Sequence, residues 1–141
     1  LHFNCQNITI KTCKIRNCYG HKDQKMNKLR SSMVGVDSGD VILFQDFEDN
    51  GEMWTGRGQR ELRRRIKFSQ KYINEPTVHL SISLFDMDAG SIMRADLTAE
   101  TVTESGFDMV FRTWGDTKVA RVRISWTSFG ELEDDDMWEV D

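Results

Sequence analysis

Cysteine is missing from most of this 141-residue chain, because Cys5, Cys13 and Cys18 all lie near the N-terminus and residues 26–141 contain none. The larger part of the chain must therefore fold without disulfide bonds, and a chain of this length can bury a core large enough to do so. The odd number of cysteines leaves an interchain disulfide open. A zinc site that combines Cys13 and Cys18 with His21 is disfavoured, because the close CxxC spacing of common zinc sites is absent.

Long apolar runs are absent as well. No segment approaches the 18 or more apolar residues that a membrane helix needs, and the N-terminus lacks the apolar core of a secretory signal. Neither membrane insertion nor export is predicted, and the cellular location stays open. The triplet Asn7-Ile8-Thr9 is a glycosylation sequon that would suit a secreted protein, but one triplet is weak evidence.

Positive charge is scarce outside the N-terminal region. Residues 1–25 hold five of the 19 Lys and Arg residues and one of the 23 Asp and Glu residues. Residues 26–141 therefore carry 14 basic and 22 acidic residues, a net charge of −8. Such an acidic body lacks the positive footprint that phosphate groups require, so nucleic acids and anionic membranes are disfavoured as partners.

The sequence also lacks the residues of a nucleophilic active site, which needs Ser or Cys beside a His that an acid orients. His79 is the one histidine in residues 26–141, and it falls in the middle of a predicted strand. The acidic segment with Asp46, Glu48 and Asp49 could in principle hydrolyse glycosides or bind calcium. The acidic run Asp134–Asp136 could also bind calcium. A small domain offers little material for a deep cleft, and neither segment matches an EF-hand loop. We therefore expect no enzyme, no metal and no cofactor.

What the chain does contain, from Met33 onward, is a series of short apolar runs separated by turn-forming residues. In Thr77–Leu84 every second residue is apolar, as in a half-buried strand. The same alternation marks residues 95–100, 107–112 and 119–126. Residues 62–68 follow it except at Arg64, and residues 34–44 are expected to form one more strand. About six short strands predict an all-β sandwich or barrel.

The predicted strands also set the expected domain limits. Residues 1–32 show no sustained apolar period, so we expect a poorly ordered tail or an extraneous lead-in, and Met26 could be the natural start. The β domain is expected over residues 33–130, followed by an acidic tail over 131–141.

Three consecutive arginines, Arg63-Arg64-Arg65, suggest a phosphate-binding patch. On a strand, however, alternate residues point to opposite faces, so the three guanidinium groups cannot form one patch. With Glu61 beside them in an acidic body, salt bridges in solvent or at an interface are favoured. Arg64 falls on an otherwise apolar face, which indicates a subunit contact or a strand edge.

Trp114 is predicted at the end of a strand, beside a tight turn that contains Gly115 and Asp116. Sugars present an apolar C–H face and a rim of hydroxyl groups, so an aromatic ring with Asp and Arg partners suits them. The alternative, that Trp114 only caps the core, fits the composition equally well.

Short motifs follow one another in a fixed order between residues 60 and 126. They are Arg60-Glu61-Leu62, Ile66-Lys67-Phe68, Pro76-Thr77-Val78, Leu80-Ser81-Ile82, Asp86, Arg94, Val102-Thr103, Gly106-Phe107, Thr113-Trp114, Thr117-Lys118-Val119 and Ile124-Ser125-Trp126. Together they resemble the H-type lectin domain, the family of snail agglutinins and of the C-terminal domain of slime-mould discoidins. The flanking segments resemble bacterial members, which would make residues 1–25 extraneous.

The resemblance implies a six-stranded antiparallel β-sandwich that assembles as a homotrimer or as a hexamer of two trimers. It also implies binding of galactose-type or N-acetylgalactosamine-type glycans at subunit boundaries, without calcium, with roles in agglutination and cell adhesion. By position, Arg94 matches the arginine that hydrogen-bonds the sugar, and Trp114 matches the tryptophan of the binding loop. Asp46 and Asp49 are the candidates for the family's acidic contact, with Asp116 as a local substitute.

Two positions depart from the family pattern. Gly115 stands where the snail agglutinin has a histidine, and Ala120 stands where a neighbouring subunit would contribute an aromatic side chain. Both departures weaken the expectation of N-acetylgalactosamine as the ligand. They also favour the alternative function, a trimeric structural or assembly module that keeps the fold without binding sugar.

Overall fold

The structure is a computed structural model that describes residues 24–134. The three cysteines, His21, the sequon and the acidic residues after Asp134 lie outside this range. The elements in chain order are β1 (Val34–Phe44), α2 (Asp46–Asp49), α3 (Glu52–Thr55), β2 (Arg60–Lys67), β3 (Thr77–Met87), β4 (Asp96–Glu100), β5 (Gly106–Thr113) and β6 (Val119–Glu131). All six predicted strands are present.

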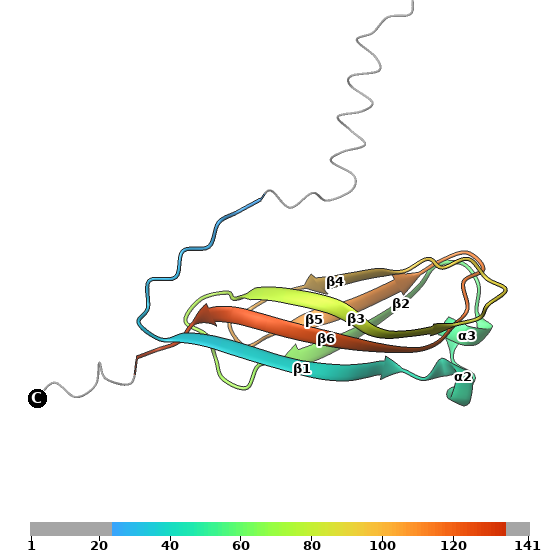
Figure 1. The fold of residues 1–141 in the computed structure, drawn as a ribbon, viewed down its shortest axis with the longest axis horizontal. Helices are drawn as coiled ribbons and strands as arrows, with labels where there is room; N and C mark the ends of the chain where they lie inside the picture. Colours follow the sequence, from blue (N-terminus) through green and yellow to red (C-terminus); the bar gives the residue numbers. More distant parts are fainter. Residues whose placement is uncertain (1–23, 135–141) are drawn as a thin grey trace, which may run out of the picture.

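The strands form two three-stranded antiparallel sheets, in the orders β1-β6-β3 and β2-β5-β4, which lie face to face (Figure 1). β6 and β5 are the central strands, so each sheet has two open edges. The prediction of an all-β, six-stranded antiparallel β-sandwich is confirmed. In residues 24–134 no helix is long and apolar enough to cross a membrane.

The hydrophobic core lies between the two sheets, where the apolar faces of the alternating strands meet. Phe107 and Phe111 of β5 are fully buried, and so are Val122 and Ile124 of β6. The ring of Phe107 packs edge-on against Trp126, with ring centroids 5.6 Å apart. Aromatic side chains of this size contribute most of the buried apolar area in such a core, so the apolar period seen in the sequence positions both central strands.

Arg64 lies on β2, which is an edge strand, so the strand-edge interpretation of this arginine is confirmed. Its guanidinium donates to the carbonyl oxygens of Ile42 (3.0 Å) and Leu43 (3.1 Å) near the end of β1. β1 leaves its regular register with β6 at this point. Arg64 therefore joins the edges of the two sheets next to the loops that follow β1.

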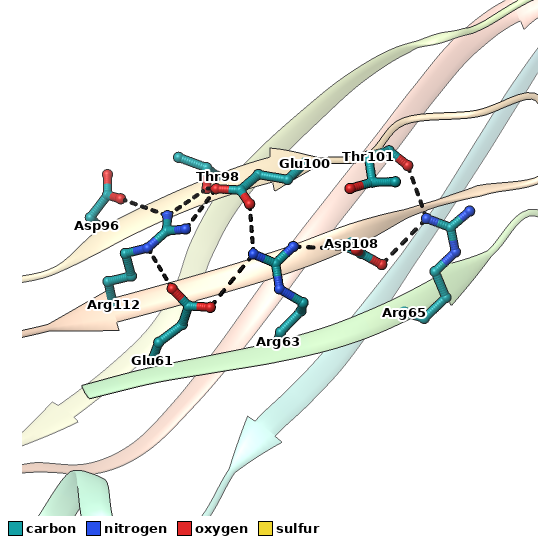
Figure 2. A network of polar contacts seen from close by, with 9 residues as sticks. All are labelled: Glu61, Arg63, Arg65, Asp96, Thr98, Glu100, Thr101, Asp108 and Arg112. Atoms are coloured by element: carbon teal, nitrogen blue, oxygen red, sulfur yellow. Dashed lines mark hydrogen bonds and ion pairs between the residues drawn. The ribbon is translucent and has the colours of Figure 1, made fainter. Parts of the chain in front are cut away.

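Arg63 and Arg65 point to the outer face of the β2-β5-β4 sheet, away from Arg64. Both bind Asp108, at 3.2 and 3.3 Å, and Arg63 also binds Glu100 at 2.7 Å (Figure 2). The three arginines therefore form no common patch, and the outward pair is neutralised by salt bridges, as the sequence predicted. Under this layer Val110, in the middle of β5, is fully buried.

Candidate functional site

Three connections meet at one end of the sandwich, on the right of Figure 1: residues 45–59 with α2 and α3, residues 88–95, and residues 114–118. Backbone hydrogen bonds join them, from the Gly58 N–H to the Gly115 carbonyl (2.9 Å) and from the Asp88 N–H to the Lys118 carbonyl (3.0 Å). We call this the loop end. Loops held by a rigid scaffold are where binding residues are commonly found.

Arg60, the first residue of β2, holds two of these connections together. Its side chain is only 3% exposed. It donates to the carbonyl oxygens of Gly58 (3.1 Å), Met53 (3.1 Å) and Gly115 (3.4 Å). A buried charge is tolerated only when hydrogen bonds satisfy it, so Arg60 fixes the turn at Gly115 relative to α3. The sequence showed Arg60 as a motif residue but not this role, since Gly115 lies 55 residues away from it in the chain.

Arg94 and Asp116 form an ion pair on this end. Arg94 Nη1 lies 2.5 Å from Asp116 Oδ1, and the two side chains are 28% and 56% exposed. The hydrogen bond from Arg94 lowers the pKa of Asp116, and the charge of Arg57 lowers it further. Asp116 is therefore an ionised hydrogen-bond acceptor at neutral pH, and Arg57 is a contributor that the sequence did not point to.

Gly115 lies directly beside this ion pair. Its backbone has φ of 68°, a conformation that favours glycine, and a Cβ at this position would lie 3.3 Å from Arg94 Nη1. The missing side chain, a departure from the family pattern, thus gives Arg94 room beside the turn. Ala120, the second departure, is 7% exposed within its own protomer.

Trp114 is 42% exposed, so it does not serve as a core cap. It lies at one end of an open groove of about 920 Å³. The groove is lined by Gln59, Arg60, Glu61, Ala95, Asp96, Thr98, Arg112, Thr113 and Trp114. The Thr113 hydroxyl donates to the Arg94 carbonyl (2.6 Å). This bond brings the chain at Arg94 beside the strand end that carries Trp114.

The structure thus brings Arg94, Trp114 and Asp116 to neighbouring positions, whereas Asp46 and Asp49 come from α2. The Asp46 carboxylate accepts a hydrogen bond from the Met53 N–H (2.8 Å) at the start of α3. It is linked to the Gly115 turn only indirectly, through Met53 and Arg60. Asp49 is exposed at the end of α2.

A further cavity, of about 770 Å³, lies among the segments 30–32 and 131–134 together with Ile73. These segments lie just before β1 and at the end of β6 and after it, and they belong to the end of the sandwich opposite the loop end (Figure 1). Its walls carry no aromatic ring, so we regard the loop end with Arg94, Trp114 and Asp116 as the candidate site. Among residues 24–134 no cluster of three or more His, Cys, Asp or Glu side chains could hold a metal ion.

Residues 63–129 match the H-type lectin domain. The chain belongs to the H-type lectin domain family. A discoidin-1 polypeptide of Dictyostelium discoideum is 34% identical to it over 79 residues, which cover 55% of this chain and 31% of that protein. The solved structure of recombinant discoidin II from the same organism has a similar fold, with a TM-score of 0.61 and 24% identity over 77% of this chain and 41% of that chain.

A protein of Fuscovulum blasticum is similar over nearly its whole length. It is named "ATP synthase subunits region ORF 7", and it is 46% identical over 108 residues, which cover 77% of this chain and 94% of that protein. This chain therefore matches that relative almost completely, but it spans about a third of discoidin-1.

Proposed function

We propose that this protein is a lectin that binds galactose-type or N-acetylgalactosamine-type glycans through Arg94, Trp114 and Asp116. The observation that carries the proposal is the Arg94–Asp116 ion pair beside the exposed ring of Trp114, within an H-type lectin domain. The guanidinium donates to sugar hydroxyls and the carboxylate accepts from them. The indole supplies an apolar surface for the C–H face of the ring.

The same geometry supports binding rather than catalysis. A general acid works best when its pKa lies near the working pH. Here Arg94 lowers the pKa of Asp116 instead. The carboxylate remains ionised and can hold hydroxyl groups, but it has no proton to transfer to a leaving group at neutral pH.

In the proposed assembly the sites lie at the subunit boundaries of a trimer or of a hexamer of two trimers. Single-sugar sites are commonly weak, and several sites in one assembly raise the avidity for a surface that displays many glycans. Agglutination or cell adhesion would follow from this arrangement. Asp46 and Asp49 remain secondary candidates for an acidic contact to the sugar.

The second candidate function is a structural or assembly module that keeps the fold without binding sugar. It is favoured by Gly115 and Ala120, which offer a ligand no side chain beyond a methyl group. It predicts a folded oligomer with no affinity for any galacto-configured sugar.

A glycan array with the full chain separates the two functions. We expect signals for neutral galacto-configured glycans, and we expect Arg94→Ala and Trp114→Ala to abolish them while strand content by circular dichroism stays unchanged. Arg65→Ala is the matched control, since it removes an exposed arginine that is ion-paired with Asp108, away from the loop end. A folded wild-type oligomer with no signal for any such glycan would favour the structural module.

A further inference from the structure

The groove beside Trp114 lies over the outer face of the β2-β5-β4 sheet, and neither Arg94 nor Asp116 lines it. Its floor is formed by residues of all three strands, among them Glu61, Asp96 and Arg112. Its volume of about 920 Å³ is near the upper end of the roughly 300–1,000 Å³ that small-molecule pockets span. A single sugar ring at the ion pair would leave this space unused.

Arg112 lies at the centre of the floor, and its donors are largely occupied. It donates to Glu61 (2.8 Å), to Glu100 (2.7 Å), to the Thr98 hydroxyl (3.2 Å) and, more loosely, to Asp96 (3.4 Å) (Figure 2). Arg112 is thereby held in place and has little capacity left to bind an anion. It acts as a fixed support for the carboxylates around it.

The carboxylates of the floor, by contrast, keep acceptor capacity. An ionised carboxylate offers about four acceptor positions. Among the described residues Asp96 accepts one hydrogen bond from a side chain, through Oδ2, and its side chain is 47% exposed. Glu61 is 45% exposed; its Oε2 lies 2.8 Å from Arg112 and its Oε1 lies 3.5 Å from Arg63. The floor therefore presents acceptors, arranged by Arg112, to groups that donate.

Charge and shape restrict the ligand further. The charged residues of the lining are balanced, with Arg60 and Arg112 against Glu61 and Asp96. The arginines are occupied, because Arg60 is buried against three carbonyl groups, so an anion would meet the exposed carboxylates first. A neutral ligand with several hydroxyl donors and an apolar face for Trp114 fits these walls.

We propose that this groove is a second sugar subsite, which holds the residue next to the terminal sugar of a neutral oligosaccharide. Hydroxyl groups of that residue donate to Asp96 and Glu61, while Trp114 contacts the ring at the junction of the two subsites. The inference rests on the proposed lectin function and names its ligand class: a neutral glycan of two or more sugars. A uronic acid or sialic acid at the second position is disfavoured by the exposed carboxylates.

Calorimetric titration of the full chain tests the subsite. Methyl galactoside is compared with a soluble, galactose-terminated neutral trisaccharide, both monovalent, so that avidity plays no part. We expect the trisaccharide to bind about tenfold more tightly, which corresponds to about 1.4 kcal/mol. Asp96→Ala should remove this gain and leave the affinity for methyl galactoside unchanged.

Two further variants keep the result interpretable. Asp86→Ala is the matched control, because Asp86 is 53% exposed and has one long ion pair (3.7 Å to Arg121) on the other sheet; it should retain the tenfold gain. Asp96→Asn preserves the side-chain size and should raise the affinity for a trisaccharide whose second sugar is a uronic acid. A side chain with only a structural role would not change the preference between neutral and acidic sugars.

The outcomes separate the subsite from the lectin function. Equal affinities of the wild-type chain for methyl galactoside and the trisaccharide, or a tenfold gain that persists in folded Asp96→Ala, would overturn the subsite and leave the lectin function standing. No heat of binding with either sugar would overturn the proposed function and the subsite with it.

Discussion

At the scale of single residues, two glycines shape the loop end. Gly58 and Gly115 have φ of 78° and 68°, and a backbone hydrogen bond joins them. They differ in their surroundings, because a Cβ at Gly58 would meet nothing within 4 Å, whereas one at Gly115 would meet the guanidinium of Arg94. Substitutions at the two glycines therefore distinguish the cost of backbone strain from a direct effect on the binding site.

Gly115→Ala should both destabilise the domain and weaken sugar binding. A left-handed backbone conformation costs a residue with a Cβ about 1–2 kcal/mol. The new methyl group would lie 3.3 Å from Arg94 Nη1, so the guanidinium that pairs with Asp116 would have to shift by a few tenths of an ångström. Urea unfolding measures the first effect and titration with a galactoside measures the second. Gly58→Ala is the control, with a similar loss of stability and full affinity. Full affinity in Gly115→Ala would show that the position of Arg94 does not matter for the ligand.

The candidate residues could be predicted from the sequence only in part. Trp114 and Asp116 lie two residues apart in the sequence, and the family motif predicts Arg94 as a sugar-binding residue. The roles of Arg60 and Arg112 depend on contacts between distant positions, such as Arg60 with Gly115 and Arg112 with Glu61. Those contacts follow from how β2, β5 and β4 pair, and the order of the strands in a sheet is not visible in their apolar period.

At the scale of elements, alternation alone predicted four of the strands, which the structure shows as β3, β4, β5 and β6. The further strand expected over residues 34–44 is β1, with those bounds. β3 continues past Leu84 to Met87 and β6 continues past Trp126 to Glu131. β6 extends through Ser128, a polar residue that is fully buried and whose hydroxyl pairs with that of Tyr72 (2.8 Å). The sequence did not predict α2 and α3, because a four-residue helix is too short to show a helical period.

The β2-β5-β4 sheet is tied together across all three strands by Glu100 of β4. This carboxylate binds Arg112 of β5 and Arg63 of β2, each at 2.7 Å. The hydrogen bond from Arg112 and then the one from Arg63 lower the pKa of Glu100 from 4.5 to about 2. Glu100 therefore stays ionised in the folded state over a pH range in which it would be protonated in the unfolded chain.

The stability that Glu100 contributes should depend on pH. Because the folded pKa is depressed, the contribution is fully present above about pH 4.5 and is lost as the pH falls towards about 2. Urea unfolding is measured at about pH 5 and at about pH 2.5. Between these two pH values the free energy of unfolding should fall less in Glu100→Gln than in the wild type. Glu48→Gln, on the exposed α2, should follow the wild type. Identical pH profiles for wild type and Glu100→Gln would contradict a stabilising role of the salt bridges from Glu100 to Arg112 and Arg63. Added salt should reduce the difference between the two proteins.

At the scale of the whole molecule, the two outer sheet faces differ in character. The β2-β5-β4 face carries charged side chains joined by salt bridges, among them those of Glu100 with Arg112 and Arg63. On the β1-β6-β3 face Val36 of β1 is paired with Phe129 of β6, and these side chains are 64% and 43% exposed. Val34, two residues away on β1, is 47% exposed. Adjacent exposed apolar side chains commonly mark a surface that another chain covers, which supports the proposed assembly of several copies.

The native mass of the full chain tests that assembly. A trimer should have three times the chain mass of 16.4 kDa, and a hexamer six times. The cysteines lie within residues 1–25, so reductant should leave the trimer whole and could only separate units joined through that segment. Val36→Asp should lower the mass by placing a charge in the contact, whereas Ser38→Asp on the same strand, further from Phe129, serves as the control. A monomeric wild type would remove the subunit boundary from the proposal and leave the sugar to the loop end of one chain, where Arg94, Trp114 and Asp116 would have to bind it alone.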